Sequence, residues 1–168
     1  ETIALKRKLE EIMAQHTGQE LEKVSRDMDR DYFMTADEAQ EYGVIDAVIT
    51  GNTTLGRRNR VFPHAVIGEI PQDLKYRGED SRLEIGDGNT FREFSTVNLG
   101  TEGGGGVTRI GNGGLFMAYS HVGHDCIIGD GAIIANGVAL AGHIVIEDHV
   151  HVSGLAAAHQ FVQLGRLS

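Results

Sequence analysis

Cysteine, long apolar segments and clusters of basic side chains are all scarce in this chain of 168 residues. Cys126 is its one cysteine, which excludes an internal disulfide bond. Gly, His or Asp interrupts the apolar runs every few residues, so neither a signal peptide nor a membrane span is predicted. We therefore expect a soluble cytoplasmic protein.

The net charge of −9 is also unfavourable for contact with nucleic acid. Residues 1–48 carry six basic and twelve acidic side chains, and residues 49–168 carry nine and twelve. A nucleic-acid-binding surface needs a basic face, which neither part offers. We expect no nucleic-acid partner.

Glycine is nearly absent from the start of the chain. Residues 1–48 contain Gly18 and Gly43, whereas residues 49–168 contain the remaining 21 glycines. Within residues 3–15 the apolar side chains recur at helical spacing, which predicts an amphipathic helix that ends near Gly18. Residues 1–48 are therefore predicted to form a small α-helical segment that is distinct from residues 49–168.

Two capping patterns predict further helices in this segment. Thr17 with Glu20, and Thr35 with Glu38, match a capping box, in which a hydroxyl and a carboxylate satisfy the free N–H groups of a first turn. The helix that follows Thr17 is expected to bury its apolar residues Leu21, Val24 and Met28. Gly43 is expected to end the last helix, and residues 44–48 are predicted to form a strand.

From residue 49 onward the dominant pattern has a period of six. Helices and strands have side-chain periods of about 3.6 and 2, so neither produces it. A period of six is typical of a parallel β-helix, in which three units form a triangular coil of about 18 residues. A second small or aliphatic residue lies four places after each inward residue, as at Cys126, which is predicted to fill the core. The inward positions are Ile110, Phe116, Val122, Ile128, Ile134, Leu140, Ile146, Val152, Ala158 and Leu164.

The same phase begins earlier in the chain and is interrupted twice. Ile49, Leu55, Val61 and Ile67 are in phase, and the pattern resumes at Ile85, Phe91 and Val97. Residues 68–84 and 99–109 are predicted to be loops pushed out from corners. Gly103 to Gly106 could cradle a phosphate, but no helix with Lys and Ser/Thr follows, which favours a flexible loop. Gly or Ala often follows an inward residue, and this predicts a sharp bend beside the neighbouring coil.

Histidines are concentrated in the repeat. Because every third unit returns to one wall, the units led by Val122, Leu140 and Ala158 are expected to stack. Each unit brings a histidine shortly after its inward residue, and a further histidine precedes the first of these units. Such a column is difficult to explain by packing, since each buried imidazole would need a partner. The histidines concerned are His121, His124, His143 and His159.

Two chemistries fit this arrangement. Three neutral imidazoles and a water molecule could bind zinc. Alternatively, one histidine could act as a general base while the others position an anionic substrate. Asp125 could orient the ring of His124, and the backbone N–H of Gly142 could stabilise an oxyanion, and both favour a general base.

Four motifs in residues 49–168 resemble the acyl-carrier-protein-dependent UDP-N-acetylglucosamine O-acyltransferases of lipid A synthesis. They are Gln-Asp-Leu-Lys-Tyr over residues 72–76, His-Val-Gly-His-Asp-Cys over 121–126, Leu-Ala-Gly-His over 140–143 and Ala-His-Gln-Phe over 158–161. The resemblance implies a left-handed β-helix, a homotrimer with active sites between subunits, and transfer of an (R)-3-hydroxyacyl group without a metal or other cofactor. The acyl group would be carried on the phosphopantetheine of acyl carrier protein.

The resemblance also implies roles for individual residues. His124 corresponds to the general base that deprotonates the sugar 3-hydroxyl, Asp125 to its partner, and Gly142 to the oxyanion donor. Residues at further positions correspond to those that bind the nucleotide sugar or the acyl donor. These substrate-binding positions are Asp73, Lys75, His121, His143, His159 and Gln160.

Residues 1–48 resemble a different family, the proteolytic subunit of the Clp protease. The resemblance rests on residues 13–19 (Met-Ala-Gln-His-Thr-Gly-Gln), 26–34 (Arg-Asp-Met-Asp-Arg-Asp-Tyr-Phe-Met) and 36–46 (Ala-Asp-Glu-Ala-Gln-Glu-Tyr-Gly-Val-Ile-Asp). Asp31 corresponds to the acid of that family's Ser-His-Asp triad. The family's serine and histidine have no counterpart here, so we expect no peptidase activity.

The chain is therefore interpreted as a chimera joined near residues 48 and 49. Three functions remain open: an acyltransferase, which truncation could have inactivated; a non-enzymatic structural or assembly module; and a remnant of a serine peptidase.

Overall fold

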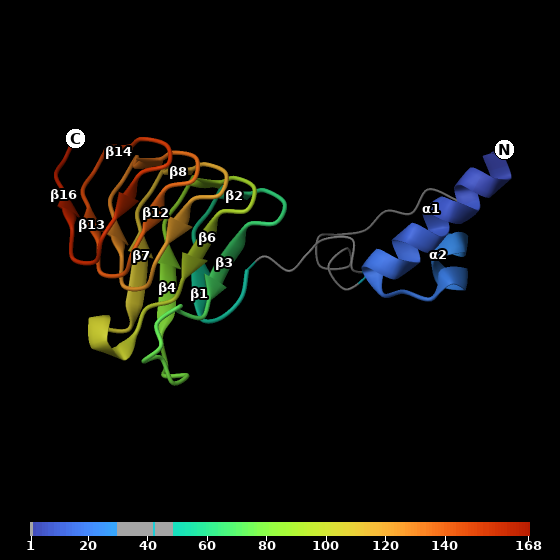
Figure 1. Ribbon diagram of the computed structural model, residues 1–168, viewed down its shortest axis with the longest axis horizontal. Helices are drawn as coiled ribbons and strands as arrows, with labels where there is room; N and C mark the ends of the chain where they lie inside the picture. The colour runs from blue at the N-terminus through green and yellow to red at the C-terminus, as the bar shows by residue number, and fades with distance from the viewer. Residues whose placement is uncertain (1, 30–41, 43–48) are drawn as a thin grey trace. The chain divides into compact units, whose positions relative to one another are not determined.

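The computed structural model describes residues 2–29, 42 and 49–168. The chain forms two compact units, Glu1–Ala47 and Val48–Ser168, which we call the helical unit and the β-helix unit (Figure 1). Asp31, the helix predicted after Thr35 and the strand predicted over residues 44–48 lie outside the described residues. No helix among the described residues is both long enough and apolar enough to cross a membrane.

The helical unit contains two described helices, α1 (Thr2–Thr17) and α2 (Leu21–Met28). Helix α1 ends beside Gly18, as predicted, and Gly18 adopts a positive φ of 69°. The predicted capping box at Thr17 is wrong. The Thr17 hydroxyl instead donates to the carbonyl of Met13 within α1, at 2.7 Å, and Glu20 precedes α2 without a side-chain cap.

Burial in the helical unit is centred on Val24, which is fully buried. The nearly buried Glu10 carboxylate accepts a hydrogen bond of 3.1 Å from the Ser25 hydroxyl and thereby links α1 to α2. Leu21 is only half-buried, and Met28, which was predicted to be buried, is 40% exposed. The short helix α2 therefore buries one apolar side chain rather than three.

The β-helix unit is a left-handed β-helix with three walls, each a parallel sheet, as predicted (Figure 1). The first wall contains β1 (Thr53–Leu55), β4 (Arg82–Ile85), β7 (Val107–Ile110), β10 (Ile127–Ile128), β13 (Val145–Ile146) and β16 (Gln163–Leu164). The second contains β2 (Arg60–Val61), β5 (Thr90–Phe91), β8 (Leu115–Phe116), β11 (Ile133–Ile134) and β14 (His151–Val152). The third contains β3 (Val66–Glu69), β6 (Thr96–Asn98), β9 (His121–Val122), β12 (Ala139–Leu140) and β15 (Ala157–Ala158).

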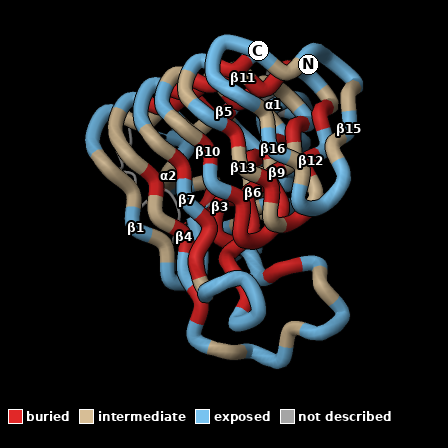
Figure 2. The backbone as a smooth tube through the Cα atoms, turned by 90° about the vertical axis from the view of Figure 1, so that its left-hand side faces the viewer, coloured by how far each residue is buried: buried red, intermediate tan, exposed pale blue. Residues whose placement is uncertain are grey.

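The predicted inward residues form the core of the β-helix (Figure 2). Most are buried, and the Phe91 and Phe116 rings stack with their centroids 4.8 Å apart. Most of the second inward set is buried as well, including Cys126 and Ile144. Ile49 pairs with Ile67 through an isolated parallel bridge, yet its side chain is 45% exposed. The predicted phase is therefore correct at Ile49, but its predicted place in the core is not.

The two loops that leave the β-helix are shorter than the sequence predicted. Strand β3 extends to Glu69 and β4 begins at Arg82, so the first loop spans residues 70–81 rather than 68–84. Strand β7 begins at Val107, and the second loop, which includes the 3₁₀ helix η1 (Glu102–Gly104), ends before it. Short polar strand segments at both loop borders pair with neighbouring coils, which the hydrophobic period could not reveal.

The corners turn through residues in the left-handed backbone region. Each lies three places after an inward residue and has φ between 57° and 66°. Non-glycine residues seldom adopt this conformation, because Cβ crowds the backbone carbonyl. Hydrogen bonds between coils hold it here: the N–H of His149, for example, donates to the carbonyl of Asp130 at 2.7 Å. The non-glycine residues at these corners are Arg58, His64, Phe94, Tyr119, Asp125, His143, His149, Leu155, Phe161 and Leu167.

The sharp bend predicted directly after the inward residue thus lies two places further along. At Gly111 and Gly129, glycine occupies the earlier position for a different reason, namely close approach of the next coil. A Cβ added to Gly111 would overlap the Asp130 carboxylate and lie 3.0 Å from the Asp130 backbone nitrogen. Gly165 is the equivalent position one coil beyond Glu147, and an added Cβ there would meet nothing within 4 Å.

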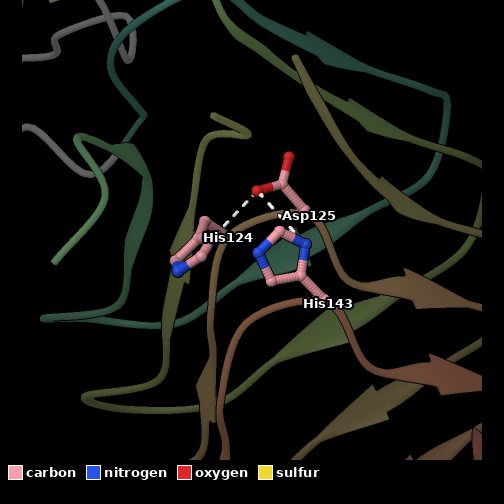
Figure 3. A group of neighbouring side chains, drawn as sticks. All are labelled: His124, Asp125 and His143. Carbon is pink, nitrogen blue, oxygen red and sulfur yellow. Dashed lines mark hydrogen bonds and ion pairs between the residues drawn. The ribbon is translucent and has the colours of Figure 1, made fainter. Parts of the chain in front are cut away.

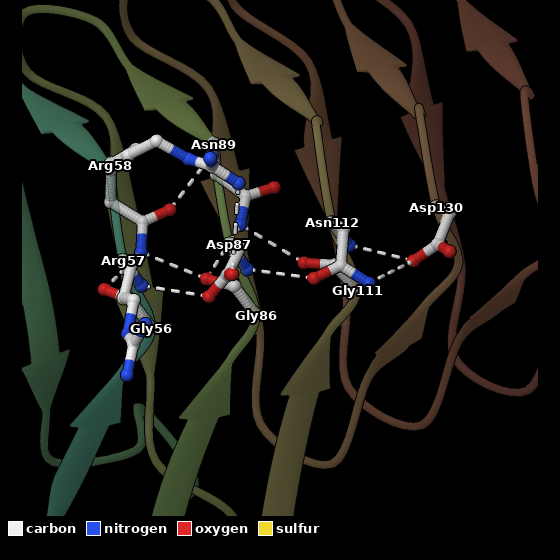
Figure 4. A network of polar contacts seen from close by, with 10 residues as sticks. Gly56, Arg57, Arg58, Gly86, Asp87, Asn89, Gly111, Asn112 and Asp130 are labelled. Atoms are coloured by element: carbon white, nitrogen blue, oxygen red, sulfur yellow. Dashed lines mark hydrogen bonds and ion pairs between the residues drawn. The ribbon is translucent and has the colours of Figure 1, made fainter.

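One corner carries a ladder of side-chain caps (Figure 4). The Oδ1 atom of Asp87 accepts the N–H of Arg57 at 2.8 Å, and that of Asn112 accepts the N–H of Asp87 at 2.8 Å. Asp130 and Asp148 continue the pattern at 2.7 and 2.9 Å. We call Asp87, Asn112, Asp130 and Asp148 the Asx ladder. It satisfies backbone donors that strand pairing leaves free at the bend.

Replacing Gly111 by Ala should destabilise the β-helix unit by about 1–3 kcal/mol, because the new methyl group displaces Asp130 from the Asx ladder. The free energy of unfolding in urea measures the loss. Gly165→Ala is the matched control and should change stability little. Equal effects of the two substitutions would contradict the close-approach argument.

Candidate active site

A histidine and an aspartate meet at the corner that follows the third wall (Figure 3). His124 and Asp125 are each only 6% exposed, and they follow the inward Val122 of β9. Nδ1 of His124 lies 2.8 Å from Oδ2 of Asp125. Because a carboxylate can only accept, Nδ1 carries a proton, and in the neutral ring Nε2 keeps its lone pair. The predicted pairing of these two residues has the geometry of an oriented base.

The second loop holds the Asp125 carboxylate. The N–H of Thr101 donates to Oδ1 at 2.8 Å, and the Thr101 hydroxyl donates to Oδ2 at 2.6 Å. The Asp125 N–H donates to Oγ1 of Thr108 at 2.8 Å, and Thr108 is fully buried. Gly104 packs so closely against the carboxylate that a Cβ there would overlap it. The glycine-rich segment therefore closes over Asp125.

His143 lies one coil further on at the left-handed corner position that Asp125 occupies. Its ring meets the His124 ring edge-on, with centroids 4.9 Å apart and planes at 89°. Its Nδ1 is 3.8 Å from Oδ2 of Asp125, and its other face stacks on Phe161 at 4.8 Å. The carboxylate thus lies between two imidazoles and is hydrogen-bonded to His124.

Gly142 lies against the Nε2 edge of the His124 ring. A Cβ added there would come within 2.5 Å of Nε2 of His124, so any side chain would cover that atom. Among the described residues, the Gly142 N–H has no hydrogen-bond partner. The Asx ladder caps the equivalent N–H groups at another corner, for example that of Asn112. A free lone pair and an uncapped N–H donor therefore occur together at this corner.

The predicted histidine column is offset in the structure. Val122, Leu140 and Ala158 do stack in register, as predicted. His124, however, follows its inward residue by two places, His143 by three and His159 by one. His159 is exposed and in register with Ala141, outside the group of His124, Asp125 and His143.

Gln160 is exposed at the position that Gly142 occupies one coil earlier. His121 lies on the outer face of β9, and its Nδ1 is 2.7 Å from Oγ1 of Thr96. Burial lowers the pKa of His121 below its usual value of 6.5, and the neighbouring His124 lowers it further. His121 is therefore held neutral near neutral pH.

A cleft of about 430 Å³ opens beside the corner. It brings together Asp73, Lys75 and His143, three of the predicted substrate-binding residues, from the first loop and the third wall. The predicted set did not include Thr101, Tyr76 or Phe161. The lining residues are Asp73, Lys75, Tyr76, Glu79, Thr101, Glu102, Gly103, His143 and Phe161.

Metal binding is the less favoured use of this group. His124, Asp125 and His143 offer one ligand atom each within 4.8 Å of one another. Both Asp125 oxygens, however, already accept hydrogen bonds from Thr101, and Oδ2 accepts a further one from His124. A cation would have to displace some of these bonds, so the hydrogen-bond pattern favours acid–base chemistry.

Cys126 follows directly in the sequence and is fully buried. Its Sγ donates to the carbonyl of Ala141 at 3.1 Å, and burial raises the pKa of the thiol to about 11. The thiolate that nucleophilic chemistry needs is thus disfavoured, which agrees with the predicted packing role.

Comparison with known proteins finds similarity to acyltransferases in the β-helix unit. Residues 108–142 match the bacterial transferase hexapeptide family (six repeats). The acyl-carrier-protein–UDP-N-acetylglucosamine O-acyltransferase of Anaeromyxobacter sp. (strain Fw109-5) is 72% identical over 120 residues, which are 71% of this chain and 47% of that protein. Residues 49–168 resemble these acyltransferases. The enzyme of Myxococcus xanthus (strain DK1622) is 60% identical over 69% of this chain and 45% of its own length.

A solved structure extends the similarity to three dimensions. The UDP-N-acetylglucosamine O-acyltransferase of Moraxella catarrhalis RH4 superposes with a TM-score of 0.67 at 48% identity, covering 67% of this chain and 44% of that structure. This chain therefore spans less than half the length of the acyltransferases described above.

The start of the chain matches a different family. Residues 1–52 match the Clp protease family, and this range contains the described residues of the helical unit, 2–29 and 42. The chain thus joins a segment similar to one family to a segment similar to another, as the sequence motifs predicted.

The lowered pKa of His121 gives a pH dependence of stability. The unfolded chain binds the His121 proton more readily than the folded chain, so the free energy of unfolding should fall as the pH drops below about 6.5. His121→Gln should reduce this fall, as measured by urea unfolding at several pH values. His151→Gln, at an exposed histidine of β14, serves as the reference. Equal pH slopes for the wild type and His121→Gln would contradict the assignment.

Proposed function

We propose that the β-helix unit transfers an (R)-3-hydroxyacyl group from acyl carrier protein to the 3-hydroxyl of UDP-N-acetylglucosamine. The observation that carries this proposal is the combination at one corner of the oriented His124 base and the uncapped Gly142 N–H. The similarity to acyltransferases supports the choice of substrates. The cytoplasmic location remains a prediction.

In the proposed mechanism, Nε2 of His124 removes the proton of the sugar hydroxyl as its oxygen attacks the thioester carbonyl. The new C–O bond forms, and the carbonyl oxygen becomes an oxyanion that accepts the Gly142 N–H. Asp125 stabilises the imidazolium through Nδ1. When the C–S bond breaks, the leaving sulfur takes the proton from His124, so the reaction needs no metal and no covalent enzyme intermediate.

The cleft is the proposed binding site for the nucleotide sugar. Lys75 supplies a cation for the diphosphate, and Asp73 supplies an acceptor for sugar hydroxyls. The Oδ1 atom of Asp73 also accepts the Lys75 N–H at 2.9 Å, so a tight turn holds both residues. His143, stacked on Phe161, also lines the cleft. His121, His159 and Gln160 complete the proposed binding residues.

Replacing His124 by Ala should lower acyl transfer at least about a hundredfold, because the proton acceptor is lost. The assay follows acylated UDP-N-acetylglucosamine by mass spectrometry, with acyl carrier protein as the donor. His151→Ala removes an exposed histidine outside the site and should retain the wild-type rate. Equal rates in the two variants would remove His124 from the catalytic role.

We further propose that the chain acts as a homotrimer with its active sites between subunits. Phe161 is 70% exposed beside the cleft, and the neighbouring His159 and Gln160 are exposed, so this side of the site is open to a second subunit. Light scattering on a size-exclusion column should give three times the chain mass of 18.2 kDa. A monomer with acyl-transfer activity would contradict this arrangement.

A non-enzymatic assembly module is the second proposed function. Leu5, Leu9 and Ile12 recur on α1 and are 61%, 46% and 43% exposed, which is typical of a face that another protein covers. A mass that rises with concentration, without acyl transfer, would favour this function. No peptidase activity is proposed for the helical unit.

A further inference from the structure

The Asp125 carboxylate lies near two imidazoles, those of His124 and His143, and it is hydrogen-bonded to His124. Its Oδ2 atom is 2.8 Å from Nδ1 of His124 and 3.8 Å from Nδ1 of His143. The two rings are in edge contact, so a small rotation of the carboxylate would exchange its partner (Figure 3). If His143 became the partner, Nδ1 of His124 would lose the acceptor that selects its tautomer.

Thr101 restrains this rotation from the side of the second loop. Its N–H binds Oδ1 and its hydroxyl binds Oδ2, so one residue holds both oxygens and fixes the plane of the carboxylate. Thr101 is only 5% exposed, and water therefore competes little with these bonds. The loop closes on Thr101 in turn, because the Gly106 N–H donates to its carbonyl at 2.7 Å.

The acceptor capacity of Oδ2 explains how Thr101 selects the partner. A carboxylate oxygen has about two lone pairs directed at donors. On Oδ2 the Thr101 hydroxyl takes one, at 2.6 Å, and Nδ1 of His124 takes the other, at 2.8 Å. Oδ2, which lies 3.8 Å from Nδ1 of His143, therefore has no lone pair left for His143.

Two further contacts hold Asp125 in place beneath the loop. Thr108 accepts the Asp125 N–H at 2.8 Å and fixes the backbone at a positive φ of 58°. Gly104 lies directly on the carboxylate, where any side chain would push the loop away. Thr101 is thus pressed against Asp125 by a loop that fits only in the absence of a side chain at position 104.

We propose that Thr101 is a positioning residue whose hydroxyl holds Asp125 on His124 and away from His143. The inference rests on the proposed function, in which His124 needs a free Nε2. Thr101 acts through Asp125 and does not itself carry the transferred proton.

The test is the tautomer of His124, read from the ¹⁵N chemical shifts of its ring in the full chain, in alkaline buffer. In the wild type the proton should reside on Nδ1. Thr101→Val keeps the shape and the backbone N–H but removes the hydroxyl, so a mixture of the Nδ1–H and Nε2–H tautomers should appear. Asp125→Asn is the reference for complete loss of the carboxylate. Thr101→Ser retains a hydroxyl and should give the wild-type spectrum.

Activity provides the second measurement. Thr101→Val should lower kcat roughly tenfold to a hundredfold, the range for one hydrogen bond to a charged group, with little change in KM. Thr101→Ser should recover most of the rate. Thr54→Val, at an exposed threonine of β1, is the matched control and should behave as the wild type in both measurements.

A wild-type tautomer in Thr101→Val would overturn the inference. Should that variant fail to fold, Gly104→Ala makes the same prediction, because it retains the hydroxyl but displaces the loop from Asp125. An unchanged tautomer in Gly104→Ala would then overturn the inference. The tautomer does not depend on turnover, so absence of acyl transfer in the wild type would overturn the proposed function and leave the positioning role to be decided by the spectra.

Discussion

The left-handed backbone at each corner is the constraint on which the rest of the β-helix depends. It turns the chain from one wall to the next without breaking the hydrogen bonds between coils, so residues of equal phase lie above one another. Asp125, His143 and Phe161 occupy this position in successive coils, and the stacked His64, Phe94 and Tyr119 occupy it at another corner. The identity of the residue at each corner therefore determines which side chains come into contact, and the backbone determines where these contacts lie.

The fold could be predicted from the sequence because its core has one simple period. A buried residue at every sixth position shows where the chain points inward, even though each strand is only a few residues long. The helical unit lacks such a repeat. Its second helix was predicted to begin at Thr17, yet the Thr17 hydroxyl bonds back to Met13, because a local side-chain bond competed with the cap.

The pairing of His124 with Asp125 could also be predicted, since adjacent residues at a tight corner remain close. The offset of the histidines could not be predicted. The six-residue period shows which residues form the walls, but it does not show which of the three residues after an inward residue contacts the neighbouring coil. Thr101 lies in a loop without periodicity, and only the folded chain brings it to Asp125. The sequence contains a weak indication for Thr108, because this residue is polar although it lies in register with the inward Cys126.

The regular stacking of coils has a consequence for changes in chain length. In coils without a loop, partners on one wall lie 18 residues apart, as Ile128 and Ile146 do, so an insertion of one residue within such a coil would turn every later side chain out of phase. An insertion of a whole coil would preserve the phase but separate the histidines. A change in length is thus least disruptive in the two loops, and one of these loops reaches the Asp125 carboxylate. The part of the unit whose length the stacked coils constrain least is therefore also the part that can adjust the site.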